Sequence, residues 1–186
     1  MLMCVLSALL VWAFTACSSV DKPDKYRVTF NSNGGKLENS IVSVEIGYSI
    51  ELPEPTKASD AFAGWYSDKE LTERVESPYT PEENITLYAK WVPYSQTDGA
   101  FTYRYDSAAG GYTVSASEVS SYPSKIDIPE TFNGTAVKKV GRFYKKPITE
   151  LTIPDSATEI EHSAFSSNDS LQTVTFGKGL VKIGGM

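Results

Sequence analysis

The chain has 186 residues and a net charge of −6, with 41% hydrophobic and 22% charged residues. This composition is that of one or two small globular domains and excludes a wholly disordered chain. The acidic balance argues against nucleic acid as a partner, because phosphate contacts need clustered Lys and Arg. The acidity is uneven: residues 26–91 hold six basic and eleven acidic residues, whereas residues 92–186 hold nine and ten.

The N-terminal 16 residues form an apolar run that contains only one serine and one threonine. The run is shorter than the roughly 20 residues of a membrane-spanning helix. It ends at Phe14-Thr15-Ala16-Cys17, which resembles the lipobox of bacterial lipoprotein signal peptides. The resemblance implies that residues 1–16 are removed as a signal peptide, that Cys17 is the site of lipid attachment, and that residues 17–25 form a polar tether. Phe14 replaces the usual leucine and no Lys or Arg precedes the run, so plain secretion and an uncleaved membrane anchor stay open.

Both cysteines, Cys4 and Cys17, precede the first charged residue, Asp21. The rest of the chain therefore has no disulfide framework and no thiolate metal site. Packing must hold an exported domain together, and an aromatic content of 12% supplies large apolar side chains for it.

Residues 26–92 carry strand and turn signals. An alternating run at Tyr26–Phe30 leads into a turn at Asn31–Gly35, and a second run of β-forming residues covers Ile85–Trp91. Between them lie a Pro53–Pro55 turn and the Trp65 region. About 65 residues suffice for one small core of aromatic and β-branched side chains.

The motifs of this segment occur in a characteristic order: Val28-Thr29-Phe30, Asn33-Gly34-Gly35, Pro55-Thr56-Lys57, Gly64-Trp65-Tyr66 and Ile85–Trp91. The order resembles the Listeria-Bacteroides repeat, the B-repeat of internalin-type surface proteins. One departure is at residues 58–62, where that family usually has a glycine-tyrosine step before the phenylalanine. The resemblance implies a small β-grasp-like domain of bacterial cell-envelope proteins, not known for catalysis.

Residues 93–99 have the composition of a linker. Beyond them, Phe101–Tyr105 and Tyr112–Ala116 alternate around Gly110-Gly111, which predicts a hairpin. A lone hairpin is only marginally stable. We therefore expect it to cover the open end of the first coil of a solenoid.

Three short strand patterns repeat after the hairpin, at Lys125–Pro129, Glu150–Pro154 and Thr173–Gly177. The spacing from Ile128 to Ile153 is 25 residues, and that from Ile153 to Phe176 is 23. A period in the low twenties is the length of a leucine-rich repeat. Apolar residues at equivalent positions would stack into ladders, with each coil burying the face of its neighbour.

The copies follow one sequence pattern, in which Ile153-Pro154-Asp155-Ser156 is followed by Ile160, Ala164-Phe165 and Leu171. This pattern resembles the BspA-like leucine-rich repeat. The copy at residues 141–146 departs from it, because the expected Ala-Phe pair is missing. The resemblance implies display at the cell surface and binding of proteins or other large partners. The sequence stops within the third copy, so we expect a truncated solenoid over residues 100–186, frayed after about Gly177.

Little in the sequence indicates catalysis. The single histidine, His162, is the sole candidate for a triad or a metal site, and its neighbours Glu159 and Glu161 do not complete a ligand set. No nucleophile elbow, phosphate-binding loop or dinucleotide fingerprint is present. We therefore expect no enzyme activity, no cofactor and no metal.

Two groups of residues are candidates for ligand contact. Trp65 and Trp91 are expected in the core, whereas Tyr66 and Tyr88 stay open between core and a sugar-stacking surface. The second group is a basic cluster in an acidic protein, suited to a polyanionic partner, with a solvated loop as the alternative. Its members are Lys138, Lys139, Arg142, Lys145 and Lys146.

The sequence thus predicts a mainly β surface lipoprotein, held on the outer face of a bacterial membrane. A β-grasp-like domain at residues 26–92 would be joined by a linker at 93–99 to a truncated leucine-rich-repeat solenoid with a hairpin cap. The solenoid would bind a host or bacterial surface protein or a glycan. The alternatives are an accessory part of a larger cell-envelope enzyme and a structural stalk.

Overall fold

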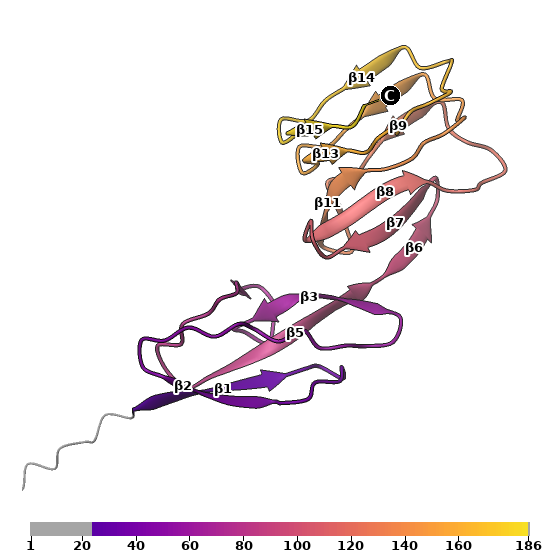
Figure 1. The fold of residues 1–186 in the computed structure, drawn as a ribbon. Coiled ribbons are helices and arrows are strands. Elements are labelled where there is room, and N and C mark those ends of the chain that lie inside the picture. Colours follow the sequence, from indigo (N-terminus) through magenta and orange to yellow (C-terminus); the bar gives the residue numbers. More distant parts are fainter. Residues whose placement is uncertain (1–23, 186) are drawn as a thin grey trace, which may run out of the picture.

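A computed structural model describes residues 24–185, so the predicted signal peptide and Cys17 lie outside the described residues. The described chain is built of strands and turns, and two modules follow one another along an elongated molecule (Figure 1). We call residues 24–93 the first module and residues 95–185 the second module. Within residues 24–185, no helix has the length and apolar character needed to span a membrane. The predicted mainly β fold class is confirmed.

The first module is a five-stranded mixed sheet in the order β2-β1-β5-β3-β4. Its central strand, β5, pairs in parallel with β1 and antiparallel with β3. The parallel pair is possible because the intervening chain crosses back over the sheet and supplies β2, β3 and β4 on the way. The strands are β1 (Lys25–Asn31), β2 (Ile41–Glu45), β3 (Asp60–Tyr66), β4 (Arg74–Val75) and β5 (Ile85–Pro93).

The core of the first module is centred on Trp65, which is 2% exposed. Its ring lies 4.9 Å from that of Phe30 and 5.4 Å from that of Phe62, and its indole N–H donates to the Pro53 carbonyl at 2.7 Å. The indole is therefore both buried and satisfied, as a core tryptophan must be. Val28 and Leu87, on the adjacent strands β1 and β5, are fully buried beside it. The prediction that Trp65 packs in the core is confirmed.

The second module begins with an antiparallel hairpin, β7 with β8, as the sequence predicts. Strand β8 then pairs in parallel with β11, so the hairpin leads directly into the parallel part of a seven-stranded sheet. The order of this sheet is β15-β13-β11-β8-β7-β6, with β10 beside β11. Its strands are β6 (Ser95–Asp98), β7 (Phe101–Asp106), β8 (Gly111–Ala116), β10 (Thr131–Phe132), β11 (Thr135–Val140), β13 (Glu159–Ile160) and β15 (Lys182–Ile183).

A second parallel sheet stacks the three repeat copies in the order β14-β12-β9. These strands are β9 (Lys125–Asp127), β12 (Glu150–Thr152) and β14 (Thr173–Thr175). Ile126, Leu151 and Val174 are aligned in one row across the sheet. The next row continues the ladder, because the Ile153 amide donates to the Thr175 carbonyl at 2.9 Å. The predicted stacking of the copies is confirmed.

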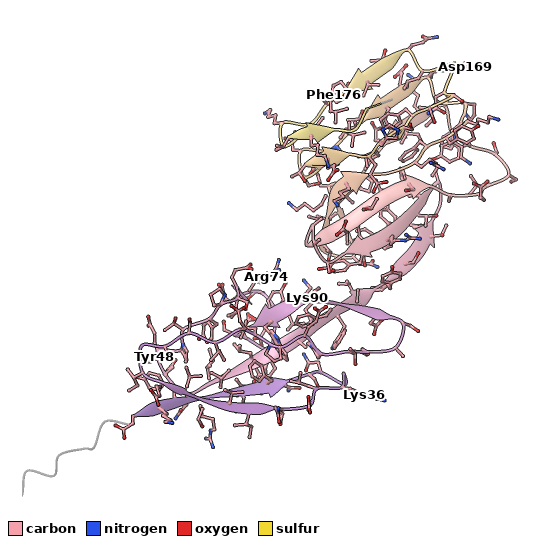
Figure 2. All side chains as sticks on the ribbon, viewed as in Figure 1. Lys36, Tyr48, Arg74, Lys90, Asp169 and Phe176 are labelled. Atoms are coloured by element: carbon pink, nitrogen blue, oxygen red, sulfur yellow. The ribbon has the colours of Figure 1, made fainter. Side chains whose placement is uncertain are left out.

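Burial within this ladder falls along the coils. Leu151 and Ile153 are 2% and 1% exposed, whereas Phe176, on the last coil beside β14, is 53% exposed (Figure 2). The chain after Gly177 nonetheless forms β15, which pairs with β13. Within the described residues, this pairing differs from the expected fraying.

The two modules are joined by nearly continuous strand, because only Tyr94 separates β5 from β6. Strand β6 pairs with β7 over four residues, so most of the linker expected at residues 93–99 is an edge strand. Its residues Ser95–Asp98 are all polar and exposed, and therefore lack the apolar alternation by which sequence reveals a strand.

Side-chain and backbone contacts also hold the junction together. The Tyr112 hydroxyl donates to the Pro93 carbonyl at 3.1 Å, and the Tyr105 amide donates to the Tyr94 carbonyl at 2.8 Å. Ala63 and Val92 of the first module belong to the buried core of the second. The junction is thus a packed interface.

Candidate binding surfaces

Four of the five basic residues singled out in the sequence are engaged in different local contacts, and the fifth, Arg142, lines a hollow at the junction of the modules. Lys139, on β11, lies 2.7 Å from an Asp106 carboxylate oxygen and 3.7 Å from one of Glu159. The side chain of Lys138, on the same strand, packs over Gly111. One of the two lysines of β11 is therefore already paired with carboxylates from β7 and β13.

The remaining members of the cluster lie beyond β11. The Lys146 ammonium donates to the Ser117 carbonyl at 3.2 Å, lies 3.5 Å from a Glu118 carboxylate oxygen and covers the Tyr122 ring at 5.1 Å. Lys145 covers the ring of its neighbour Tyr144. These contacts give Lys146 a structural role, since its side chain is only 14% exposed.

A row of alternating charges crosses the outer face of the seven-stranded sheet. Its order is Asp106, Lys139, Glu159 and Lys182, from β7 to β15. The hydrogen bond from Lys139 holds the pKa of Asp106 below its usual range, and the one from Lys182 lowers the pKa of Glu159. Lys139 faces Glu159 and Glu159 faces Lys182, and these opposite charges at facing positions favour the observed register of β11, β13 and β15.

Carboxylates also connect successive coils at their turns. The two Glu130 carboxylate oxygens accept from the amides of Asp155 and Ser156 at 2.8 and 2.7 Å. Asp155 accepts in turn from the Lys178 amide of the next coil at 2.7 Å. The hydrogen bonds from the Asp155 and Ser156 amides lower the pKa of Glu130. Amide groups that a coil leaves unpaired at its turn are thus satisfied by the coil before it.

The outer face of the β9-β12-β14 sheet is a small polar plane. Alternation places Ile126, Leu151 and Val174 inward and their neighbours outward. One outward row contains Lys125 and Glu150, whose charged atoms are 2.8 Å apart. The other row consists of Asp127, Thr152 and Thr175.

A hollow lies on each side of Tyr94, at the junction of the modules. One has a volume of about 260 Å³ and is lined from the first module by Lys57, Asp60 and Trp91, among others. The other, of about 780 Å³, is lined from the second module by Arg104, Arg142 and others. Tyr94 is not among the residues singled out from the sequence, because it stands in the segment expected to be a linker.

The other candidate residues differ in how deeply they are buried. Tyr66 is 8% exposed, whereas Trp91 and Tyr88 are half-buried. The Trp91 indole donates to the Ser32 carbonyl at 2.8 Å, which fixes the ring against the turn after β1. His162 is exposed. Among residues 24–185, His, Cys, Asp and Glu side chains form no group of three or more that could hold a metal ion.

Family models match both modules. Residues 26–90 match the Listeria-Bacteroides repeat domain, and residues 139–186 match the BspA type leucine rich repeat region. In this chain, a Listeria-Bacteroides repeat domain is therefore followed by BspA-type leucine-rich repeats. Both are non-catalytic repeat domains typical of surface proteins. Within the matched residues, β12 and β14 are successive strands of the parallel ladder that such repeats form, and β9 extends that ladder before the match begins.

Two proteins of Evansella cellulosilytica resemble parts of the chain. One, named "Putative membrane protein", is 41% identical over 106 residues, and the other, named "Putative Gly-rich membrane protein", is 44% identical over 70 residues. The matches cover 56% and 37% of this chain but only 15% and 8% of those proteins. Among solved structures, a leucine-rich repeat protein from Bacteroides capillosus is 24% identical, with a TM-score of 0.40, over 48% of this chain and 70% of that one.

Proposed function

We propose that the chain is a lipid-anchored protein of the bacterial cell envelope whose leucine-rich repeats bind a partner protein through the outer face of the β9-β12-β14 sheet. The observation that carries this proposal is the common register of the three strands, which aligns their outward side chains in rows. Aligned rows form a flat surface of fixed geometry, on which several side chains contact a partner together. The Listeria-Bacteroides repeat domain would hold this surface away from the membrane.

The side chains on this face are suited to binding a partner and not to catalysing a reaction. The Lys125–Glu150 pair is satisfied within the sheet, whereas Asp127, Thr152 and Thr175 offer hydrogen-bonding groups to a partner. Three strands about 4.8 Å apart and about 10 Å long make a patch of roughly 100 Å². A stable interface covers about 800 Å² on each side. The partner would therefore also contact the neighbouring loops.

The test is a screen of the full chain, purified in detergent, against extracellular-matrix proteins. We expect a protein that binds the chain, and at least tenfold weaker binding when Asp127→Arg and Thr152→Arg are combined. The matched control is Glu38→Arg, a charge reversal at an exposed position of the first module. Equal binding by both variants would move the contact away from this sheet, and no binding at all would favour a structural stalk. An accessory role in a larger envelope enzyme predicts instead that the chain binds that enzyme's substrate.

The lipid anchor has its own test. Cells expressing the full chain are grown with radiolabelled palmitate, and the Cys17→Ser variant is compared with the unchanged chain and with Cys4→Ser. We expect label and membrane association to be lost with Cys17→Ser alone. Label that persists in that variant would rule out acylation of Cys17, and membrane association without label would indicate an uncleaved anchor.

A further inference from the structure

The two hollows beside Tyr94 belong to one groove. Tyr94, Tyr105 and Ser107 line both of them, so the hollows share a continuous wall. We call the combined feature the junction groove. It runs from the Lys57 region of the first module to residues of β7 and β8 in the second. Both modules are needed to form it.

Tyr94 presents its side chain to solvent from a fixed backbone. Its carbonyl accepts from the Tyr105 amide at 2.8 Å, and its amide donates to the Ser59 carbonyl at 3.4 Å. The residue is nevertheless 53% exposed, whereas Tyr103, Tyr105 and Tyr112 nearby are at most 5% exposed. A large, half-apolar ring held in this way is available to a ligand.

Most of the rest of the lining is polar and carries charges of both signs, with the rings of Phe62 and Trp91 on the side of the first module. Lys57 and Asp60 form an ion pair of 2.8 Å at one end. At the other end lie Arg104 and Arg142, which make no ion pair within 4 Å among residues 24–185. In all, the groove is lined by three basic and four acidic side chains: Lys57, Arg104 and Arg142, with Glu54, Asp60, Asp106 and Glu161.

This lining selects a class of ligand. We infer that the junction groove binds a neutral oligosaccharide, with one pyranose ring stacked on Tyr94. Each sugar hydroxyl can donate one hydrogen bond and accept two. The groove offers both kinds of group, since Arg104 and Arg142 donate, Glu161 accepts, and the hydroxyls of Thr113 and Ser115 do both. The apolar face of a pyranose covers an aromatic ring through weak C–H contacts.

Other ligand classes fit less well. A polyanion would meet four carboxylates in the groove, which outnumber its basic groups. A peptide anchored by apolar side chains needs an apolar pocket. The mainly apolar hollow of about 380 Å³ lies instead on the last coil, beside Val174, Phe176 and Ile183. The junction groove is therefore suited to a neutral and polyhydroxylated chain.

The junction groove is a different surface from the one proposed to bind a protein. The β9-β12-β14 face lies on the second parallel sheet, whereas the junction groove uses β7 and β8 of the seven-stranded sheet. A substitution in one surface should therefore leave the other unchanged. Failure of one proposal would not imply failure of the other.

The experiment is isothermal titration of the full chain in detergent with four neutral hexasaccharides: cellohexaose, maltohexaose, laminarihexaose and β-1,4-mannohexaose. A heparin hexasaccharide and a tryptic digest of gelatin are titrated alongside. We expect at least one neutral hexasaccharide to bind, and its affinity to fall about tenfold in Tyr94→Ala, the loss expected for a central contact residue. The matched control is Tyr48→Ala. Tyr48 is 66% exposed and lies in the turn after β2, away from the junction (Figure 2).

Thr113→Val provides a second variant that removes a groove hydroxyl with little change in shape, and we expect it to weaken sugar binding severalfold. Circular dichroism melting curves establish that each variant is folded. Failure of all four neutral sugars to bind would overturn the inference, as would equal weakening by Tyr94→Ala and Tyr48→Ala. Tyr94-dependent binding of heparin or of gelatin peptides without a neutral sugar would reassign the groove to those ligands.

Discussion

The Listeria-Bacteroides domain and the leucine-rich repeats bury similar side chains in different geometries. In the first, the buried residues surround one point, where Trp65 contacts Phe30 from β1 and Phe62 from its own strand. In the second, the buried residues follow the chain from Tyr103 through Leu151 to Ala164, coil after coil. The first core is closed on itself, and the second is a row that each coil extends.

The two core geometries predict different cooperativity of unfolding. A closed core loses many contacts at once when its central residue is removed, whereas a stack of coils divides into terms between nearest neighbours. We therefore expect the two modules to respond differently to comparable substitutions. The last coil should open most readily, because Phe176 and Ile183 are 53% and 62% exposed.

The largest expected effect is that of Trp65→Ala. Removing a fully buried aromatic ring costs about 3–5 kcal/mol, and the loss of its N–H bond to Pro53 adds to the cost. We expect all strands of the first module to lose amide-exchange protection together, with the second module retaining most of its own. Hydrogen exchange with mass spectrometry measures both. Protection lost only around β3 would contradict a closed core.

Next in size is Leu151→Ala, in the middle of the ladder. A cost of about 2–5 kcal/mol is expected, since Leu151 is 2% exposed and lies between Ile126 and Val174. Exchange should increase most in β12 and β14 and least in β7 and β8. Val181→Ala, at a position 87% exposed, is the control and should change little. Uniform loss of protection across the second module would show that the coils unfold as one unit.

A smaller effect is expected from Tyr112→Phe at the junction. The ring stays buried, but the hydroxyl can no longer donate to the Pro93 carbonyl. The loss is about 1 kcal/mol and should weaken the coupling between the modules. The separation between the unfolding transitions of the two modules in a urea titration measures this coupling. Tyr48→Phe, at an exposed tyrosine, should leave the transitions unchanged, and identical curves for all three proteins would argue against this coupling.

The smallest expected effect is a loss of fold stability at acidic pH. Hydrogen bonds lower the pKa of Glu130 from 4.5 and that of Asp106 from 3.8. Because their folded pKa values lie below the unfolded ones, these groups stabilise the fold above about pH 4.5 and lose that contribution as pH falls through the folded values. A lowered pKa is found in the first module for Asp68, through its bond from the Thr72 hydroxyl.

We therefore expect the leucine-rich repeats to lose protection before the first module between about pH 5 and pH 3. Hydrogen exchange across that range tests the order. Glu130→Gln removes one titrating group and should reduce the acid sensitivity of the turn that it shares with Asp155. Earlier loss in the first module would contradict the expectation.

The sequence predicts those parts of the fold that depend on local periodicity. Alternation reveals β1, β7 and β8, and the recurrence of Ile126, Leu151 and Val174 reveals the parallel ladder. These signals are strong because burial on one face of a sheet imposes a period of two along the strand. The ladder adds a second period, set by the length of one coil.

The binding surfaces depend on contacts that local patterns do not record. Strand β6 is polar on both faces, so its sequence is that of a linker, and with it Tyr94 escapes notice. Lys139 belongs to a basic run in sequence, yet its partner Asp106 is 33 residues away and comes from another strand. Charge in a run of residues says little about charge on a surface until the strand order is known.

The parallel pairing of β1 with β5 has a mechanical consequence. A pull applied between Lys25 and Pro93 would draw these neighbouring strands in opposite directions along their length. The four aligned pairs from Val28–Ile85 to Asn31–Tyr88 would then bear the load simultaneously, in shear. They would not open one after another. If the proposed lipid anchor and the proposed partner hold the two ends of the chain, drag would load this one strand pair.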